Sequence, residues 1–225
     1  MYKFAKRISD IILALLLLIV ISPWLLIIIM ILPFFGEGEI FFKQKRMGLN
    51  NKPFEIYKFA TMLKISAQIG TGSLTVRNDF RVTSIGKYLR MTKINELPQL
   101  INILNGDMSF IGPRPLMEVD FNRYPEEIKN NVYLVKPGLT GIGSIIFRDE
   151  QLILTESSLT PVETYEKLIL PYKGALEVWY QKNASVITDI KIFCLTILCI
   201  LYPSTTLPQR SFSGLPNRDS LNLKS

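Results

Sequence analysis

Any chemistry in this chain has to rest on carboxylates, amides, arginines and lysines, because none of its 225 residues is a histidine. Nucleophilic mechanisms that depend on histidine are therefore excluded, and so are histidine-containing metal sites. The two cysteines, Cys194 and Cys199, are too few for a four-cysteine zinc site or a disulfide scaffold. A metal ion in this chain must accordingly be held by oxygen atoms.

Positive charge is concentrated in one part of the chain, whose overall net charge is +7. Residues 43–93 carry eleven basic and two acidic side chains, whereas residues 94–189 carry eight basic and thirteen acidic ones. A basic block beside an acidic one suits an anionic ligand or a membrane surface. It argues against a protein that binds nucleic acid through a uniformly basic surface.

Gly-Pro-Arg-Pro at residues 112–115 is a short motif suited to anion binding. Its two prolines hold Arg114 on a stiff extended backbone, and a preset guanidinium group suits a phosphate or a carboxylate. The alternative is a surface turn with a solvated arginine. No glycine-rich phosphate-binding loop of the GxGxxG or GxxxxGK[ST] type occurs in the sequence.

Asn95 and Glu96 come directly before a predicted helix. Apolar residues follow them at helical spacing, at Leu97, Leu100, Ile101 and Leu104. Pro98 stands in the first turn, and Asn105-Gly106 ends the helix. This pattern makes Asn95 the N-cap and places Glu96 at the positive end of the helix.

The remaining pattern predicts an α+β fold. Residues 40–44 and 53–59 form a β-hairpin around the turn at 48–51. A loop follows at residues 64–76, and helices are predicted at 84–91 and at 165–178, the second kinked at Pro171.

A membrane segment precedes this domain. Residues 11–32 are apolar except for Ser22, and at ~1.5 Å per residue they reach ~33 Å, enough to cross a bilayer core. Pro23 predicts a kink or break that Ser22 helps to satisfy, and basic residues flank the segment on both sides. These features favour a re-entrant helix that enters and leaves the cytoplasmic leaflet; the alternative is a kinked transmembrane anchor.

The chain is thus divided into three parts. Residues 1–39 form the membrane-inserted helix, residues 40–202 form a small cytoplasmic domain, and residues 203–225 are predicted to be disordered. The apolar stretch 190–202 is too short to span a bilayer and is predicted to be an interfacial helix or a core helix near the membrane.

Several motifs follow one another in a characteristic order. They are Ser22-Pro23, Pro53-Phe-Glu-Ile-Tyr-Lys-Phe59, Arg81-Val-Thr-Ser-Ile-Gly-Lys-Tyr-Leu-Arg90, Glu96-Leu-Pro-Gln-Leu100, Gly106-Asp-Met-Ser109, Gly112-Pro-Arg-Pro115 and Lys136-Pro-Gly-Leu-Thr-Gly141. Together they resemble the bacterial sugar transferases, the monotopic phosphoglycosyl transferases that begin capsule, O-antigen and glycoprotein glycan assembly. The likeness covers roughly residues 1–200.

The resemblance implies a location on the cytoplasmic face of the bacterial inner membrane and a Mg2+ requirement. It also implies transfer of a sugar phosphate from a UDP-sugar to polyprenyl (undecaprenyl) phosphate, with release of UMP. The expected partners are these two substrates and membrane lipids, with no nucleic acid, and a homodimer is compatible with the sequence. The basic residues expected to receive the diphosphate are Lys58, Arg77, Arg81, Arg90 and Arg114, of which Arg90 and Arg114 lie within the matched motifs.

The catalytic position differs from the family pattern, which has an Asp-Glu pair where this chain has Asn95-Glu96. An amide oxygen is a weak nucleophile without charge, so the family role of the aspartate does not carry over to Asn95. Three interpretations follow. In the first, Glu96 acts as the sole carboxylate, either as nucleophile or as metal ligand. In the second, Asp107 or Asp149 completes the site, Asp107 as a metal ligand; in the third, the protein is a catalytically silent relative that acts as a binding or scaffold protein. Other departures are Ala60 and Gly141-Ile-Gly-Ser-Ile145.

Overall fold

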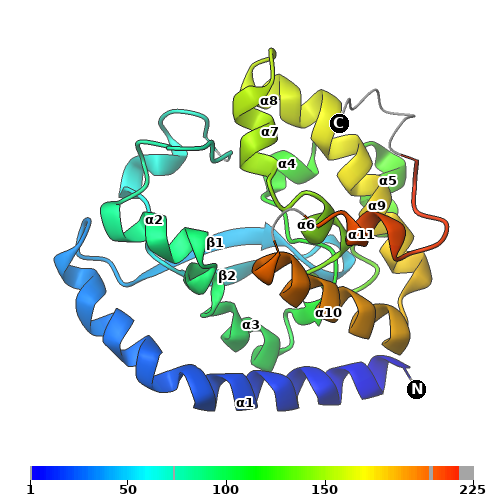
Figure 1. Ribbon diagram of the computed structural model, residues 1–225, viewed down its shortest axis with the longest axis horizontal. Helices are drawn as coiled ribbons and strands as arrows, with labels where there is room; N and C mark the ends of the chain where they lie inside the picture. Colours follow the sequence, from blue (N-terminus) through cyan, green and yellow to red (C-terminus); the bar gives the residue numbers. More distant parts are fainter. Residues whose placement is uncertain (1, 73, 203–204, 218–225) are drawn as a thin grey trace.

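The structure, a computed structural model, describes residues 2–72, 74–202 and 205–217. It is a mixed helix and strand fold in which a long N-terminal helix runs along one side of the other elements (Figure 1). The helices are α1 (Tyr2–Ile31), α2 (Ser84–Met91), α3 (Gln99–Asn105), α4 (Glu118–Phe121), α5 (Glu126–Val132), α6 (Ile142–Ile146), α7 (Glu150–Glu156), α8 (Pro161–Thr164), α9 (Leu170–Asn183), α10 (Val186–Leu201) and α11 (Leu207–Arg210). The strands are β1 (Phe41–Met47), β2 (Pro53–Phe59), β3 (Ser109–Ile111) and β4 (Gly138–Thr140).

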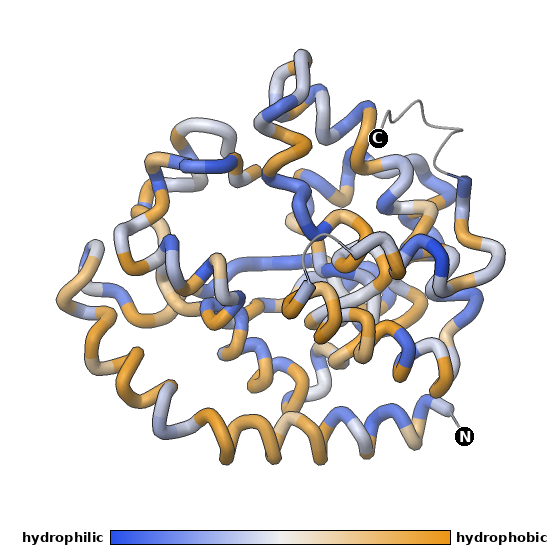
Figure 2. The backbone as a smooth tube through the Cα atoms, in the orientation of Figure 1, coloured by the Kyte–Doolittle hydropathy of each residue, from blue (hydrophilic) through white to orange (hydrophobic). Residues whose placement is uncertain are grey.

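Most apolar residues of α1 are exposed, and Figure 2 shows that this helix is hydrophobic over most of its length and runs along the outside of the fold. Within the described residues, the segment Tyr2–Phe34 is the one helix long and apolar enough to cross a membrane. The helix bends along its length (Figure 1) and contains Pro23. The Ser22 hydroxyl donates a hydrogen bond of 2.9 Å to the Ile19 carbonyl, the acceptor that the missing N–H of Pro23 leaves open. The predicted kink and the predicted role of Ser22 are thus both present.

Both ends of α1 pack against the rest of the protein. Near its start, the Arg7 guanidinium donates to two carbonyls at the C-terminal end of α3, at 2.5 and 2.7 Å, where a cation is favourable. Asp10, which is buried, accepts two hydrogen bonds of 3.0 Å from β3. At the other end, fully buried Leu32 packs in a cluster with Phe59 and Leu89.

The predicted β-hairpin is confirmed. Strands β1 and β2 are antiparallel, with Phe41 opposite Phe59 and Met47 opposite Pro53. The turn between them is a short 3-10 helix (Leu49–Asn51) containing asparagines with positive φ, a conformation that asparagine tolerates better than most residues. The hairpin brings Lys58 close to the start of α3, because β2 packs against that helix and against the turn that precedes it.

A second, short sheet was not predicted and brings two turn motifs together. Strands β3 and β4 pair in parallel, with Ser109 opposite Gly138 and Ile111 opposite Thr140. The pairing continues beyond the strands, because the N–H of Gly112 donates to the Thr140 carbonyl at 3.0 Å. The Gly-Pro-Arg-Pro segment therefore lies beside the Lys-Pro-Gly-Leu-Thr-Gly segment.

The predicted helix at 165–178 is confirmed in a more elaborate form. It begins as a π-helix (Tyr165–Ile169) and continues as α9, with Pro171 in the first turn of α9. Pro171 is tolerated there because its missing N–H costs least near a helix start. Helix α9 is largely buried and contributes Leu176 and Tyr180 to the main core.

The C-terminal region differs in part from the prediction. Residues 190–201 of the apolar stretch are part of α10, which buries Ile192, Leu195 and Cys199 and leaves its other face exposed. Residues 205–217 contain α11, and the Phe212 ring packs edge-on against Trp179 with centroids 5.4 Å apart. The prediction of disorder overlooked these apolar contacts; residues 203–204 and 218–225 of that segment lie outside the described residues.

Candidate active site

Glu96 lies at the centre of a cluster of basic side chains that come from separate elements. Its Oε1 accepts from Arg114 Nη2 at 2.7 Å and from Lys58 Nζ at 3.2 Å. Lys58 comes from β2, Arg114 from the segment after β3, and Glu96 from a 3-10 turn (Ile94–Glu96) that leads into α3. The side chains of Glu96 and Lys58 are 13% and 15% exposed, and that of Arg114 is 34% exposed. The structure thus brings the predicted residues Glu96, Lys58 and Arg114 together in a partly buried site.

The charge state of Glu96 follows from these contacts. Burial alone would raise the pKa of the Glu96 carboxyl, but the charges of Arg114 and Lys58 outweigh burial and hold the pKa well below its usual value. Its second oxygen, Oε2, accepts no hydrogen bond from the described part of the chain. Glu96 is therefore an ionised carboxylate with one oxygen committed to cations and the other available.

Positive charge is in excess around Glu96. Burial, reinforced by neighbouring Arg114 and Arg46, lowers the pKa of Lys58 to about 7, although the Glu96 charge opposes this. Burial and the Arg114 charge also lower the pKa of Arg46 to about 10. Burial likewise lowers the pKa of Arg90 and of Lys93. A dianionic group bound here would relieve this repulsion, so the site is built for an anion such as a diphosphate.

Asn95 is not the N-cap of α3, contrary to the prediction. The N-cap position belongs to Pro98, which has no side chain able to accept a hydrogen bond, and Asn95 lies in the preceding 3-10 turn. Its side chain is buried, and Oδ1 has no hydrogen-bond partner among the residues that the structure describes. An unpaired buried oxygen beside Glu96 is costly for folding, which makes Asn95 a candidate functional residue rather than a helix cap.

The two alternative carboxylates lie elsewhere. Asp107 is exposed and follows the C-terminal end of α3, so a helix of seven residues separates it from Glu96. Asp149 is 59% exposed and pairs with its neighbour Arg148 at 2.5 Å. The structure therefore brings neither Asp107 nor Asp149 to Glu96.

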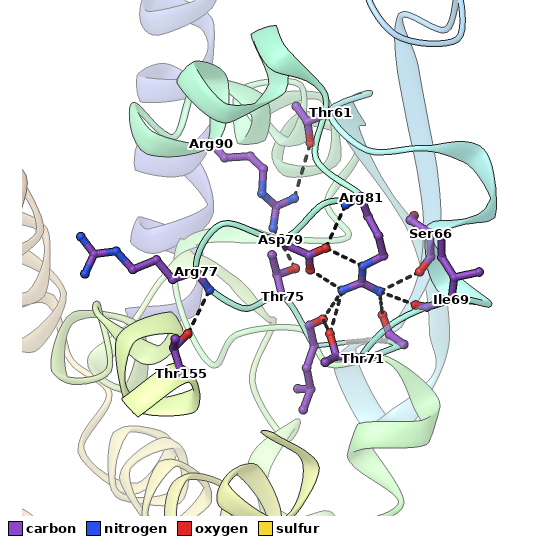
Figure 3. Close-up of polar contacts among 12 residues, drawn as sticks. Thr61, Ser66, Ile69, Thr71, Thr75, Arg77, Asp79, Arg81, Arg90 and Thr155 are labelled. Atoms are coloured by element: carbon purple, nitrogen blue, oxygen red, sulfur yellow. Dashed lines mark hydrogen bonds and ion pairs between the residues drawn. The ribbon is translucent and has the colours of Figure 1, made fainter. Parts of the chain in front are cut away.

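Arg81 has a different role from the predicted contact with substrate. Its side chain is 1% exposed, pairs with Asp79 at 2.6 Å and donates to four backbone carbonyls of the loop between residues 66 and 74 (Figure 3). A guanidinium with its donors used in this way cannot also receive a diphosphate. Arg81 instead holds this glycine-containing and threonine-containing loop together.

Arg90 and Arg77 differ in their relation to the site. Arg90 donates to Thr75 Oγ1 at 2.9 Å and, more weakly, to Thr61 Oγ1 at 3.4 Å, and the charges of Glu96 and Arg114 both act on it. The Arg77 side chain is exposed and points away from Arg81 and Arg90 (Figure 3), while its backbone N–H donates to Thr155 Oγ1. Arg90 therefore belongs to the basic cluster, and Arg77 does not.

Sequence reasoning missed three acidic or basic residues near the site. Arg46 donates to Gln44 and to the Pro115 carbonyl, and its charge acts on Lys58. Glu177 accepts a hydrogen bond from the backbone N–H of Arg114, and Glu150 pairs with the buried Lys173 of α9. For Glu177, the signal available in the sequence was a pair of charged residues, Lys173 and Glu177, within the largely apolar run 168–180.

The residues at the site fit a Mg2+ ion only together with a substrate. Among the described residues, no group of three aspartate, glutamate, cysteine or histidine side chains gathers at one place. Glu96 supplies one carboxylate, and Asn95 Oδ1 is an unpaired amide oxygen. Mg2+ commonly takes one or two protein oxygens and completes its shell with phosphate oxygens and water, which is compatible with this pair.

Comparison with known proteins gives a consistent result. The profile of the bacterial sugar transferase family matches residues 1–203. The chain is 37% identical over 196 residues to an uncharacterised sugar transferase, EpsL, of Bacillus subtilis (strain 168), and the match covers 87% of each protein. It is 31% identical over 198 residues to the exopolysaccharide production protein PSS of Rhizobium leguminosarum bv. phaseoli, covering 86% of this chain and 93% of PSS.

Relatives with named substrates are longer. The UDP-glucose:undecaprenyl-phosphate glucose-1-phosphate transferase of Escherichia coli (strain K12) is 35% identical over 198 residues, which are 87% of this chain but 40% of that protein. This chain therefore spans about two fifths of the length of that relative. Since the family profile covers nearly all of the sequence, and the cluster around Glu96 lies in the motifs that carry the likeness, the chain belongs to the bacterial sugar transferase family.

Proposed function

We propose that this protein transfers a sugar 1-phosphate from a UDP-sugar to undecaprenyl phosphate, releasing UMP and starting the assembly of a polysaccharide or glycan. The names of the E. coli transferase and of the undecaprenyl-phosphate galactose phosphotransferase of Salmonella typhimurium support this reaction class. The observation that carries the proposal is the ionised carboxylate of Glu96, which pairs with Lys58 and Arg114 inside an excess of positive charge.

The reaction forms a bond from an oxygen nucleophile to the β-phosphorus of the UDP-sugar. Either the phosphate of the lipid attacks directly, or Glu96 attacks first and the lipid phosphate then displaces it from the same phosphorus. The bond between that phosphorus and the bridging oxygen breaks, and UMP leaves with the electron pair. Lys58, Arg114 and Arg90 bind the diphosphate and stabilise the charge that develops on the leaving phosphate. Glu96 is the carboxylate on which turnover depends; the pairing of Asp149 with Arg148 and the position of Asp107 beyond the end of α3 support this choice.

Mg2+ belongs to this proposal as the cofactor. Glu96 and Asn95 would hold it through their oxygens, and when bound it would neutralise part of the charge of the diphosphate and of the departing UMP.

The test is UMP release from membranes that contain the protein. UDP-sugars, Mg2+ and undecaprenyl phosphate are supplied together, and UMP is measured. We expect UMP release with at least one UDP-sugar. Release of more than one UMP per protein molecule should require the lipid acceptor. If every UDP-sugar leaves the protein inert, the transferase proposal fails, and a catalytically silent binding or scaffold protein takes its place.

We propose further that α1 is re-entrant and that the domain lies on the cytoplasmic face of the inner membrane. Residues near both ends of α1 contact the same domain: Arg7 bonds to α3, and Leu32 packs with Phe59 and Leu89. A helix that crossed a bilayer core of about 30 Å would instead place its two ends on opposite sides. The bend and the Ser22 contact to Ile19 support the same topology.

This topology predicts that positions 3 and 43, both exposed, face the cytoplasm. In a variant whose Cys194 and Cys199 are replaced by alanine, Lys3→Cys and Lys43→Cys should resist a membrane-impermeant thiol reagent added to intact cells. Both should react after the cells are permeabilised. Labelling of either position from outside intact cells would contradict the re-entrant topology.

The pKa of Lys58 predicts a pH dependence. Because this pKa is lowered to about 7, the ammonium of the free protein loses its proton as the pH rises through neutrality, and with it an attraction for the diphosphate. We expect kcat/KM for the UDP-sugar to fall above pH 7, approaching tenfold per pH unit, since this parameter reports the ionisation of the free enzyme. Lys58→Arg keeps its charge and should flatten the profile between pH 6.5 and 8.5; identical profiles for the two proteins would refute the assignment.

A further inference from the structure

Glu177 is a buried carboxylate that the proposed chemistry does not use. It lies in the middle of α9 and is 2% exposed. Its Oε1 accepts a hydrogen bond of 3.3 Å from the backbone N–H of Arg114, whereas its Oε2 is buried without a hydrogen-bond partner among the described residues. Burying a carboxyl group with so few partners costs stability, so its presence calls for a compensating role.

The backbone of Arg114 is held from two sides. Glu177 accepts from its N–H, and the Tyr133 hydroxyl donates to its carbonyl at 2.8 Å. The same hydroxyl accepts from the N–H of Leu116 at 2.9 Å, which fixes the chain beyond Pro115. The guanidinium that reaches Glu96 at 2.7 Å therefore starts from a backbone that two buried side chains keep in place.

Helix α6 provides the space for the Glu177 carboxyl. A Cβ atom on Gly143 would lie 2.5 Å from Glu177 Oε1 and 3.1 Å from its Cδ, both too close for an unshifted side chain. Because Glu177 is 2% exposed and its Oε1 accepts from the Arg114 N–H, a shift of the carboxyl away from this Cβ would disturb that bond. A Cβ on Gly141 would be 3.7 Å from Oε2, in ordinary contact.

The protonation of Glu177 is compatible with a role in holding the backbone. Burial raises its pKa to about 7, although the bond from Arg114 and the nearby Lys173 charge oppose this shift. In either protonation state the group retains a carbonyl-type oxygen that can accept from the Arg114 N–H. Glutamine has the same shape and the same acceptor, so it is a suitable replacement in a test.

We infer that Glu177 is a positioning residue for the transfer reaction: it fixes the backbone of Arg114, so that the Arg114 guanidinium stays paired with Glu96. Residue 143 is glycine because the Glu177 carboxyl fills the space beside it. This inference rests on the proposed function. Glu177 acts through Arg114 and does not itself touch the substrate.

The first test compares Glu177→Gln with Glu177→Asp, using kcat/KM for UMP release. Glutamine keeps the acceptor and should stay within about threefold of the wild type. Aspartate withdraws the acceptor by about 1.5 Å, and we expect a loss of about tenfold, since a displacement of this size at a positioned group is costly.

The decisive comparison repeats Glu177→Asp in an Arg114→Met background. If Glu177 acts through the Arg114 guanidinium, Glu177→Asp should lower kcat/KM by less than about twofold in this background, because the group that Glu177 positions is gone. If the full loss recurs in that background, Glu177 acts elsewhere and the inference is wrong. Wild-type activity of Glu177→Asp in the native background would also overturn it.

A second cycle does not depend on activity. Gly143→Ala and Glu177→Asp should each lower Tm, whereas the double variant should regain most of the loss, because the alanine methyl fills the space that the shorter side chain leaves. Additive lowering of Tm would refute the fit between residues 143 and 177. This cycle is informative even if the wild type releases no UMP, an outcome that would defeat the proposed function alone.

Discussion

Glu96→Gln should lower the turnover of UMP release at least ~100-fold, the size usual for the loss of one key electrostatic group. Glutamine keeps the shape of the side chain and can still accept from Arg114 and Lys58. It removes the negative charge, however, which weakens Glu96 either as a nucleophile or as a ligand of Mg2+. The loss should appear in kcat of the folded protein. Tm should also fall, because the neutral amide leaves the positive charges of Arg114 and Lys58 uncompensated.

Two other carboxylates serve as matched controls. Asp107→Asn and Asp149→Asn make the same chemical change at exposed positions that the structure places away from Glu96. Both should retain turnover within about twofold, as is usual for surface substitutions. Substantial residual activity in Glu96→Gln, or a comparable loss in either control, would show that Glu96 is not the carboxylate on which turnover depends.

Arg114→Met should reduce kcat/KM for the UDP-sugar by about 100-fold. The substitution removes a guanidinium that pairs with Glu96 at 2.7 Å and that the proposal places against the diphosphate. Arg114→Lys restores the charge but not the planar fork, so it should recover only part of the loss. Steady-state rates over a range of UDP-sugar concentrations would separate the effects on KM and kcat.

Arg77→Met is the control for this substitution. It removes an arginine of the basic block 43–93, and its side chain is exposed and directed away from Arg81 and Arg90 (Figure 3). Its kcat/KM should stay within about twofold of the wild type. An equal loss in Arg77→Met and Arg114→Met would indicate a general effect of positive charge and would contradict a specific role for Arg114.

Local patterns in the sequence predicted the elements that are determined locally. The hairpin, α2 and α3 follow from apolar spacing and turn residues, and Gly106 ends α3 with a φ of 89°, a value suited to glycine. The Ser22-Pro23 pair likewise predicted the bend in α1. Each of these features depends on residues within a few positions of one another.

The errors concern contacts that apolar spacing and turn residues do not reveal. Arg81 was expected at the diphosphate, but its donors are used by Asp79 and by carbonyls of a preceding loop, which no local pattern reveals. Glu177 reaches Arg114 across 63 positions of the sequence, and the parallel pairing of β3 with β4 joins two segments that each read as isolated turns. Asn95 looked like a helix cap because its type and position suit one, but Pro98 takes that position.

The most direct test of the proposed reaction is the fate of the β-phosphate of the donor. A UDP-sugar labelled at its β-phosphate is incubated with membranes containing the protein and with undecaprenyl phosphate, and the lipid is then extracted. A phosphoglycosyl transferase moves the sugar and the β-phosphate together, so the label should enter the lipid fraction while unlabelled UMP remains in the water phase. Glu96→Gln should leave the label in the donor. Transfer of the sugar without the label, with labelled UDP in the water phase, would show ordinary glycosyl transfer and would contradict the account.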